Sequence, residues 1–140
     1  MFEKILTAVD GSDETDAVIA VVIGFAKTAG STVEVVHVHE HEARPARFGM
    51  AIDLETKAEA QQIVDRAVEK LKEGGVEARG WLLEAHVPDV AKRIVDAANE
   101  SGANLIVVGR RELSNLEEML VGSVSNKVVH LSRVPVLIAR

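Results

Sequence analysis

The sequence has no cysteine among its 140 residues, which excludes disulfide bonds, cysteine nucleophiles and thiolate metal sites. Aromatic residues make up only 3%, so the core has to be built from aliphatic side chains. The longest apolar run, Ala17 to Ala26, has ten residues, whereas a membrane-spanning helix needs about twenty. The N-terminus also lacks the basic region and cleavage site of a signal peptide. We therefore expect a soluble, cytoplasmic protein.

Basic residues are in the minority. Sixteen lysine and arginine residues face twenty-two aspartate and glutamate residues, which gives a net charge of −6. A surface of this sign repels nucleic acid, and no block of basic residues offsets it. Because 47% of the residues are hydrophobic and 27% are charged, the composition is that of a globular protein. The length predicts a single domain over residues 1–140.

Strand-like and helix-like segments alternate along the chain. Short runs of β-branched residues predict strands, and longer amphipathic segments that end at glycine predict helices. Ser12 is expected to cap the first helix, and Pro88 to lie in the first turn of the third. The predicted strands are 4–9, 32–38, 76–83, 105–108 and 134–139, and the predicted helices run to 29, over 53–73, to about 101, and from about 122 onward.

This alternation predicts an α/β fold, an open five-stranded parallel sheet with helices on both faces. Ligands of such sheets bind beyond the carboxyl ends of the strands, at the point where the strand order reverses. The first strand ends at Asp10, and Asp13 and Glu14 follow it closely. This acidic turn repels phosphate, but it suits sugar hydroxyls or base nitrogens, which donate hydrogen bonds to a carboxylate.

The turn after the fourth strand has the opposite character. It begins at Gly109, continues with Arg110 and Arg111, and reaches a predicted helix start at Gly122 and Ser123. Exposed amide groups and the helix dipole favour an anion at such a position. The two turns together offer what a mononucleotide needs. The alternative is purely structural, because glycines at strand ends and serines at helix starts also serve the backbone alone.

Three segments carry a family resemblance: KILTAVDGSD, LIVVGRRELSNLEEMLVGSVSNKVV and VPVLIAR. They resemble the universal stress protein family, and the resemblance covers the whole chain. The signature of that family is glycine, two residues, glycine, nine residues, then glycine followed by serine or threonine. Gly109, Gly122 and Ser123 match this signature, whereas Glu112 stands where its second glycine belongs.

The resemblance implies a Rossmann-like fold of the adenine nucleotide alpha hydrolase type and a homodimer formed through the last strand. It also implies a regulatory or sensor protein of the stress response that binds ATP or AMP, with Mg²⁺ as a companion ion. Asp10 would then meet the ribose or base, and Val9 and Val38 would line the adenine pocket. The full set of implied binding residues is Val9, Asp10, Val38, Val108, Gly109, Arg110, Gly122, Ser123, Val124 and Ser125.

Glu112 leaves alternatives open. A non-glycine residue costs about 1–2 kcal/mol if the position needs a positive φ. A carboxylate about 5 Å from a phosphate costs roughly 3 kcal/mol at an effective dielectric constant of 20. A monophosphate, or no nucleotide at all, is therefore an alternative to a triphosphate. The alternative functions are a dimeric interaction protein that has lost nucleotide binding and a weak ATPase, although no general base stands beside an evident nucleophile.

His37, His39 and His41 alternate, so in a continuing strand they project to one face. Imidazoles on one face can ligate Zn²⁺, Ni²⁺ or Cu²⁺. Glu40 and Glu42 would point the other way, and spacing alone gives no further ligand. The alternative is a strand that simply runs into a solvated loop.

Pro135 lies in the last predicted strand. It has no backbone N–H group, which suits a strand at the edge of the sheet. An apolar edge strand is prone to aggregation, and a second copy of the chain would cover it.

Overall fold

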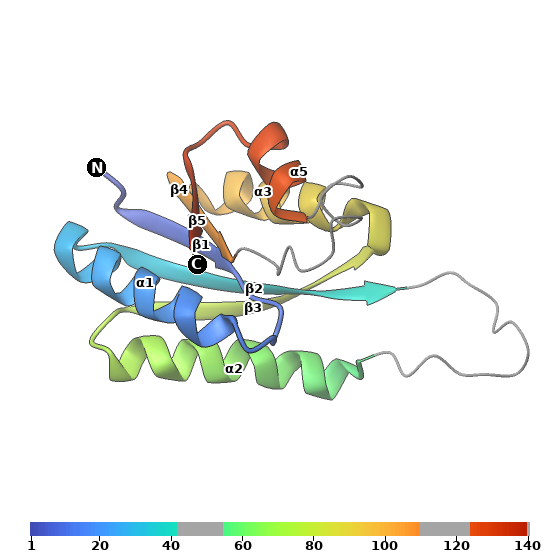
Figure 1. Ribbon diagram of the computed structural model, residues 1–140, viewed down its shortest axis with the longest axis horizontal. Coiled ribbons are helices and arrows are strands. Elements are labelled where there is room, and N and C mark those ends of the chain that lie inside the picture. Colours follow the sequence, from blue (N-terminus) through green and yellow to red (C-terminus); the bar gives the residue numbers. More distant parts are fainter. Residues whose placement is uncertain (42–54, 110–123, 140) are drawn as a thin grey trace, which may run out of the picture.

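The computed structural model describes residues 1–41, 55–109 and 124–139, apart from the side chain of Val87. In these ranges five strands form one parallel sheet in the order β3-β2-β1-β4-β5 (Figure 1). The strands are β1 (Lys4–Ala8), β2 (Thr32–His41), β3 (Ala78–His86), β4 (Leu105–Gly109) and β5 (Val136–Ala139). The predicted α/β fold is thereby confirmed, and β5 occupies an edge of the sheet as Pro135 indicated.

Helices cover both faces of the sheet. In Figure 1, α1 (Thr15–Ala29) and α2 (Lys57–Glu73) lie on one side, and α3 (Val90–Ser101) and α5 (Val124–Leu131) lie on the other. The short 3₁₀ helix η2 (Val87–Asp89) leads into α3. Within the described ranges, no helix combines the length and the apolar character that crossing a bilayer would require.

The core is split into two layers by the alternation of side chains along the strands. On β2, Val33 and Val35 pack toward α1 and α2, whereas Val36 and Val38 pack toward α3 and α5. Each of these four valines is buried, because both faces of the sheet are covered. The aliphatic composition of the chain therefore supplies both layers.

The start of α1 differs from the prediction. Ser12 does not cap the helix; Glu14 is the capping position, and no side chain accepts a hydrogen bond there. The backbone N–H of Ser12 instead donates to Asp10 Oδ1 at 2.9 Å, and the Ser12 carbonyl accepts from the Thr15 N–H at 3.0 Å. These contacts form a separate turn before the helix, because an aspartate side chain readily binds the amide two residues on.

The second helix also begins later than predicted. It starts at Lys57, because Thr56 caps it by accepting a 3.1 Å hydrogen bond from the backbone N–H of Glu59. Residues 53 and 54 of the predicted helix lie outside the described residues. In the third helical segment, Pro88 lies in η2 and α3 begins at Val90. The predicted start of the last helix, residues 122–123, also lies outside the described residues.

Two strands reach farther than predicted. The sequence predicts that β2 ends at residue 38 and β3 at residue 83, but they end at His41 and His86. They continue as a pair, with His39 opposite Glu84 and His41 opposite His86. The sequence did not predict this extension, because the polar residues after residues 38 and 83 are typical of a loop.

Candidate functional site

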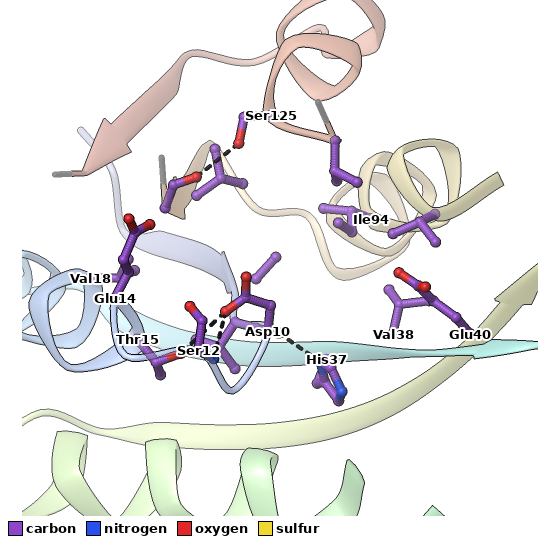
Figure 2. A pocket seen from close by; sticks show the side chains of 16 residues that line it. Asp10, Ser12, Glu14, Thr15, Val18, His37, Val38, Glu40, Ile94 and Ser125 are labelled. Carbon is purple, nitrogen blue, oxygen red and sulfur yellow. Dashed lines mark hydrogen bonds between the residues drawn. The ribbon is translucent and has the colours of Figure 1, made fainter. Parts of the chain in front are cut away.

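A cavity opens where the strand order reverses. The chain builds β1, β2 and β3 in one direction across the sheet and then returns to place β4 on the other side of β1. The cavity lies beyond the carboxyl ends of β1 and β4 (Figure 2), which is the position expected for a ligand site in an open α/β sheet. Its described lining residues are Ala8, Val9, Asp10, Ser12, Glu14, Thr15, Val18, His37, Val38, Glu40, Val90, Ile94, Val108, Gly109, Val124 and Ser125.

Most of the predicted binding residues meet around this cavity. Arg110, Gly122 and Ser123 lie outside the described residues, as does Glu112. The predicted residues that line the cavity are Val9, Asp10, Val38, Val108, Gly109, Val124 and Ser125. The end of β1, the end of β4 and the start of α5, which the sequence predicts to share one ligand, therefore border one cavity.

Other residues line the cavity although they are not among the binding residues that the sequence predicts. Ser12 and Thr15 follow Asp10 in the same turn, so their proximity to Asp10 was available from the sequence. Val90 and Ile94 come from α3, and His37 from β2. Only the packing of α3 on the sheet brings the first two to the cavity, and no sequence pattern indicated it.

Asp10 is exposed on one side of the cavity, and its carboxylate organises the turn after β1. Its Oδ1 accepts the Ser12 N–H and lies 3.5 Å from the Thr15 hydroxyl oxygen. Gly11, between them, has a φ of 77°, which L side chains rarely adopt, and a Cβ there would lie 2.5 Å from Ile63 Cδ1. In Figure 2, Asp10, Ser12 and Thr15 gather on one side and Ser125 lies across the cavity.

Gly109 and Ser125 form that opposite side. The Ser125 hydroxyl donates a 2.8 Å hydrogen bond to the carbonyl oxygen of Gly109 (Figure 2). A Cβ on Gly109 would lie 2.8 Å from Val18 Cγ2, so α1 packs closely against β4 and a side chain at position 109 would force one of them to shift. Packing thus favours glycine at position 109, whatever ligand the cavity takes.

Apolar side chains from both layers of the core form the inner wall. Val9 and Val18 belong to the layer under α1, and Val38, Ile94 and Val108 belong to the layer under α3. They leave a slot with aliphatic surfaces on two sides. Such a slot suits a flat, weakly polar ring more than a charged group.

His37 fixes the base of the cavity. This buried side chain lies on β2, and its Nδ1 donates to the carbonyl oxygen of Val9 across 2.7 Å. Its Nε2 lies 3.0 Å from both carboxylate oxygens of Glu55, just before α2. The ring therefore links the end of β1 to the start of α2 and is held at both nitrogens.

The electrostatic character of the described wall is acidic. Asp10, Glu14 and Glu40 line the cavity, and none of its described lining residues is lysine or arginine. The first turn of α5 borders the cavity through Val124 and Ser125. The positive N-terminal end of the helix dipole of α5 partly offsets the negative charge of the wall. The arrangement favours a ligand with hydrogen-bond donors on one side and a small anionic group on the other.

The predicted histidine face divides. His37 turns to Val9 and Glu55, whereas His39 and His41 remain together and meet Glu84 from β3. Glu40 lines the cavity and so points away from them, as predicted. Spacing along the sequence could not predict that Glu84 joins His39 and His41, because Glu84 lies on a neighbouring strand.

Comparison with known proteins agrees with this geometry. Residues 1–140 match the model of the universal stress protein family. Universal stress protein YxiE of Bacillus subtilis (strain 168) is 36% identical over 100% of both chains. The structure of a universal stress protein from Archaeoglobus fulgidus is similar with a TM-score of 0.78, 28% identity and 100% coverage of both chains.

A second solved structure adds a ligand. It is the universal stress protein from Archaeoglobus fulgidus in complex with dAMP, and it is similar with a TM-score of 0.74, 27% identity and 100% coverage of both chains. The present chain therefore belongs to the universal stress protein family. The resemblance seen in the sequence is confirmed at the level of family and fold.

Proposed function

We propose that this universal stress protein binds an adenine nucleotide, ATP or AMP, in the cavity between β1 and β4 and acts as a regulatory or sensor module in the stress response. The observation that carries the proposal is the position of Asp10 beside an aliphatic slot at the strand-order reversal. The similar Archaeoglobus fulgidus protein in complex with dAMP supports the same ligand class.

The base occupies the aliphatic slot in this proposal. Val9, Val38 and Val108 line the cavity and are otherwise buried in the core, so they form a fixed aliphatic wall. Burying an adenine ring there removes apolar area from water on both sides of the ring, which stabilises the complex without a charge.

The ribose is placed at Asp10. A carboxylate has about four lone-pair sites, so Asp10 can hold its own turn and still accept from a sugar hydroxyl. The contacts from Ser12 and Thr15 orient the carboxylate before the ligand arrives. A hydrogen bond to an ionised group contributes about 1.5–3 kcal/mol, which is enough to fix the orientation of the nucleoside.

The phosphate is placed at the start of α5. Ser125 and the amide end of the helix border the cavity there, and Arg110, Gly122 and Ser123 remain predicted contacts outside the described residues. Each further phosphate adds negative charge to a wall that already holds Asp10, Glu14 and Glu40. We therefore expect AMP to bind at least as tightly as ATP unless Mg²⁺ accompanies the triphosphate.

The test is calorimetric titration of the purified protein with AMP, ATP, ATP plus Mg²⁺, and adenosine. Asp10→Ala is expected to weaken AMP binding about tenfold or more, as the loss of a charge-assisted hydrogen bond implies. Asp10→Asn keeps an acceptor oxygen for the turn, so its AMP affinity should lie between those of wild type and Asp10→Ala. Asp13→Ala is the matched control, because Asp13 is an exposed acid of the same turn that does not line the cavity.

Two results would contradict the proposal. One is the absence of adenine nucleotide binding at millimolar concentration. The other is equal AMP affinity in Asp10→Ala and wild type, with the fold of both proteins verified by circular dichroism.

The homodimer through β5 belongs to the same proposal. β5 pairs only with β4 among the described strands, which leaves its other side at the sheet edge. Ile138 on β5 and Leu131 on α5 are 41% and 50% exposed. A second copy that pairs with this edge would cover both side chains.

A further inference from the structure

A second group of ligand-type side chains lies at the far end of β2 and β3, on the face that α2 covers. In this parallel pair His39 lies opposite Glu84 and His41 opposite His86. Opposite residues share a face of the sheet, as do residues two positions apart on one strand. One ligand atom each from His39, His41 and Glu84 lies within 4.8 Å of the others. None of the three lines the cavity described above.

The hydrogen bonding of His39 determines which of its nitrogens is available. Its Nε2 lies 2.8 Å from the backbone carbonyl oxygen of Glu55. A carbonyl oxygen only accepts, so Nε2 carries the proton and the lone pair of the neutral ring is on Nδ1. Nδ1 is buried and has no hydrogen-bond partner within the described part of the chain. A buried acceptor without a donor is unfavourable unless something binds it.

This arrangement is typical of a metal-binding histidine. A ligating imidazole usually donates its second N–H to a carbonyl or carboxylate, which fixes the ring and directs the other nitrogen at the ion. The Glu55 carbonyl does this for His39. The hydrogen bond to Glu55 therefore leaves Nδ1 as the nitrogen of His39 that can ligate an ion.

The other two members are accessible. The side chains of His41 and Glu84 are 47% and 48% exposed, and His41 Nε2 lies 3.7 Å from Glu84 Oε2. Lys57 Nζ lies 3.6 Å from the other oxygen, Oε1. The Glu84 carboxylate thus attracts the Lys57 ammonium group, and Lys57 would compete with a bound metal ion for this carboxylate.

We propose that His39, His41 and Glu84 bind one divalent transition-metal ion of the Zn²⁺ class. Two imidazole nitrogens and a carboxylate oxygen select Zn²⁺, Ni²⁺ or Cu²⁺ over Mg²⁺ and Ca²⁺, which prefer oxygen ligands. Zn²⁺ with three protein ligands keeps a fourth tetrahedral position for water or an exchangeable ligand. The ion joins the ends of β2 and β3 and does not depend on nucleotide binding.

The test uses tag-free protein that has been stripped with a chelator. Titration with Zn²⁺ is expected to give one ion per chain, and Co²⁺ substitution is expected to give the absorption bands of a tetrahedral site. His41→Ala and Glu84→Gln should each weaken binding at least tenfold, and both positions are exposed, so the variants should fold. Lys57→Gln should strengthen binding. His130→Ala is the matched control, since it removes an exposed histidine from α5.

Three outcomes would overturn the proposal. They are the absence of Zn²⁺ binding at millimolar concentration, binding that is unchanged in both His41→Ala and Glu84→Gln, and binding that His130→Ala weakens as much as His41→Ala does. The AMP titration of the same variants serves as the independent readout, because an intact AMP affinity shows that the fold is preserved if the protein binds AMP. Circular dichroism provides that check if it does not.

Discussion

The Ser125 hydroxyl donates a 2.8 Å hydrogen bond to the carbonyl oxygen of Gly109. This contact ties the first turn of α5 to the carboxyl end of β4, and both residues line the cavity. Gly109 is the last residue of β4 and Ser125 the second residue of α5, so the bond joins the ends of two elements that are adjacent in the order of the described elements. The two elements that would meet a phosphate are therefore fixed relative to one another by one side chain.

Ser125→Ala is expected to lower the free energy of unfolding by about 1 kcal/mol, the usual net value of one hydrogen bond. Because α5 is then held less firmly, AMP affinity should also fall by about fivefold if a similar free energy is lost on binding. Urea unfolding and calorimetry measure the two effects. Ser132→Ala is the control, since its hydroxyl donates to the Val134 carbonyl oxygen at 2.7 Å, away from the cavity. Equal loss of AMP affinity in both variants would contradict a local role for Ser125.

Gly109→Ala is expected to destabilise the protein by about 1–3 kcal/mol, because the new Cβ would lie 2.8 Å from Val18 Cγ2. The double variant with Val18→Ala removes that methyl group. Adding Gly109→Ala to Val18→Ala should therefore cost less than adding it to wild type, with a coupling of about 1 kcal/mol. Urea unfolding of the four proteins measures this coupling, and strict additivity would show that the contact is relieved elsewhere.

Ile138→Asp tests the proposed dimer. We expect wild type to sediment as a dimer and the variant as a monomer, because the substitution puts a charge on the exposed edge strand. Trp81→Asp is the control, because Trp81 is 51% exposed on β3, at the opposite edge of the sheet. Analytical ultracentrifugation distinguishes the two edges. A monomer produced by Trp81→Asp alone would place the interface on β3.

The lowered pKa of the Glu3 carboxyl group predicts a loss of stability at low pH. Its pKa lies below the ordinary value of 4.5, chiefly because its own backbone amide binds it and also because the Asn104 amide donates to it at 2.8 Å. A lowered pKa stabilises the folded state above the unfolded pKa, and this contribution is lost as the pH falls through the folded pKa. Asn104→Ala should raise the pKa of Glu3 part of the way back. Carbon-detected NMR titration measures it, and an unchanged pKa would rule out the contribution of Asn104.

The layers of the fold were predictable because both faces of the sheet are covered. A strand buried on both sides needs apolar residues throughout, and Leu105 to Val108 shows this pattern. Helix starts were less predictable, since a cap depends on competition among neighbouring groups. Ser12 is a residue type that often caps helices, but its amide donates to Asp10 in a separate turn, and α1 begins at Thr15.

The site was predictable where its residues come from the turns at the ends of β1 and β4. Asp10 and Gly109 stand out because each directly follows an apolar strand. Ile94 and Glu84 could not be found in this way. The first reaches the cavity through the packing of α3, and the second meets His39 through the register between β2 and β3. Both relationships join residues far apart in the chain and carry no local pattern.

The central position of β1, between β2 and β4, limits the order in which the strands can pair during folding. Thr7 on β1 donates its hydroxyl proton to the carbonyl oxygen of Val107 on β4, at 3.1 Å and across 100 positions of the chain. During synthesis, one side of β1 therefore stays unpaired until β4 has left the ribosome. Contacts of such long range slow folding, because a large loop must close before they form. The cavity lies between β1 and β4, so a nascent chain lacks the proposed nucleotide site until β4 has paired with β1.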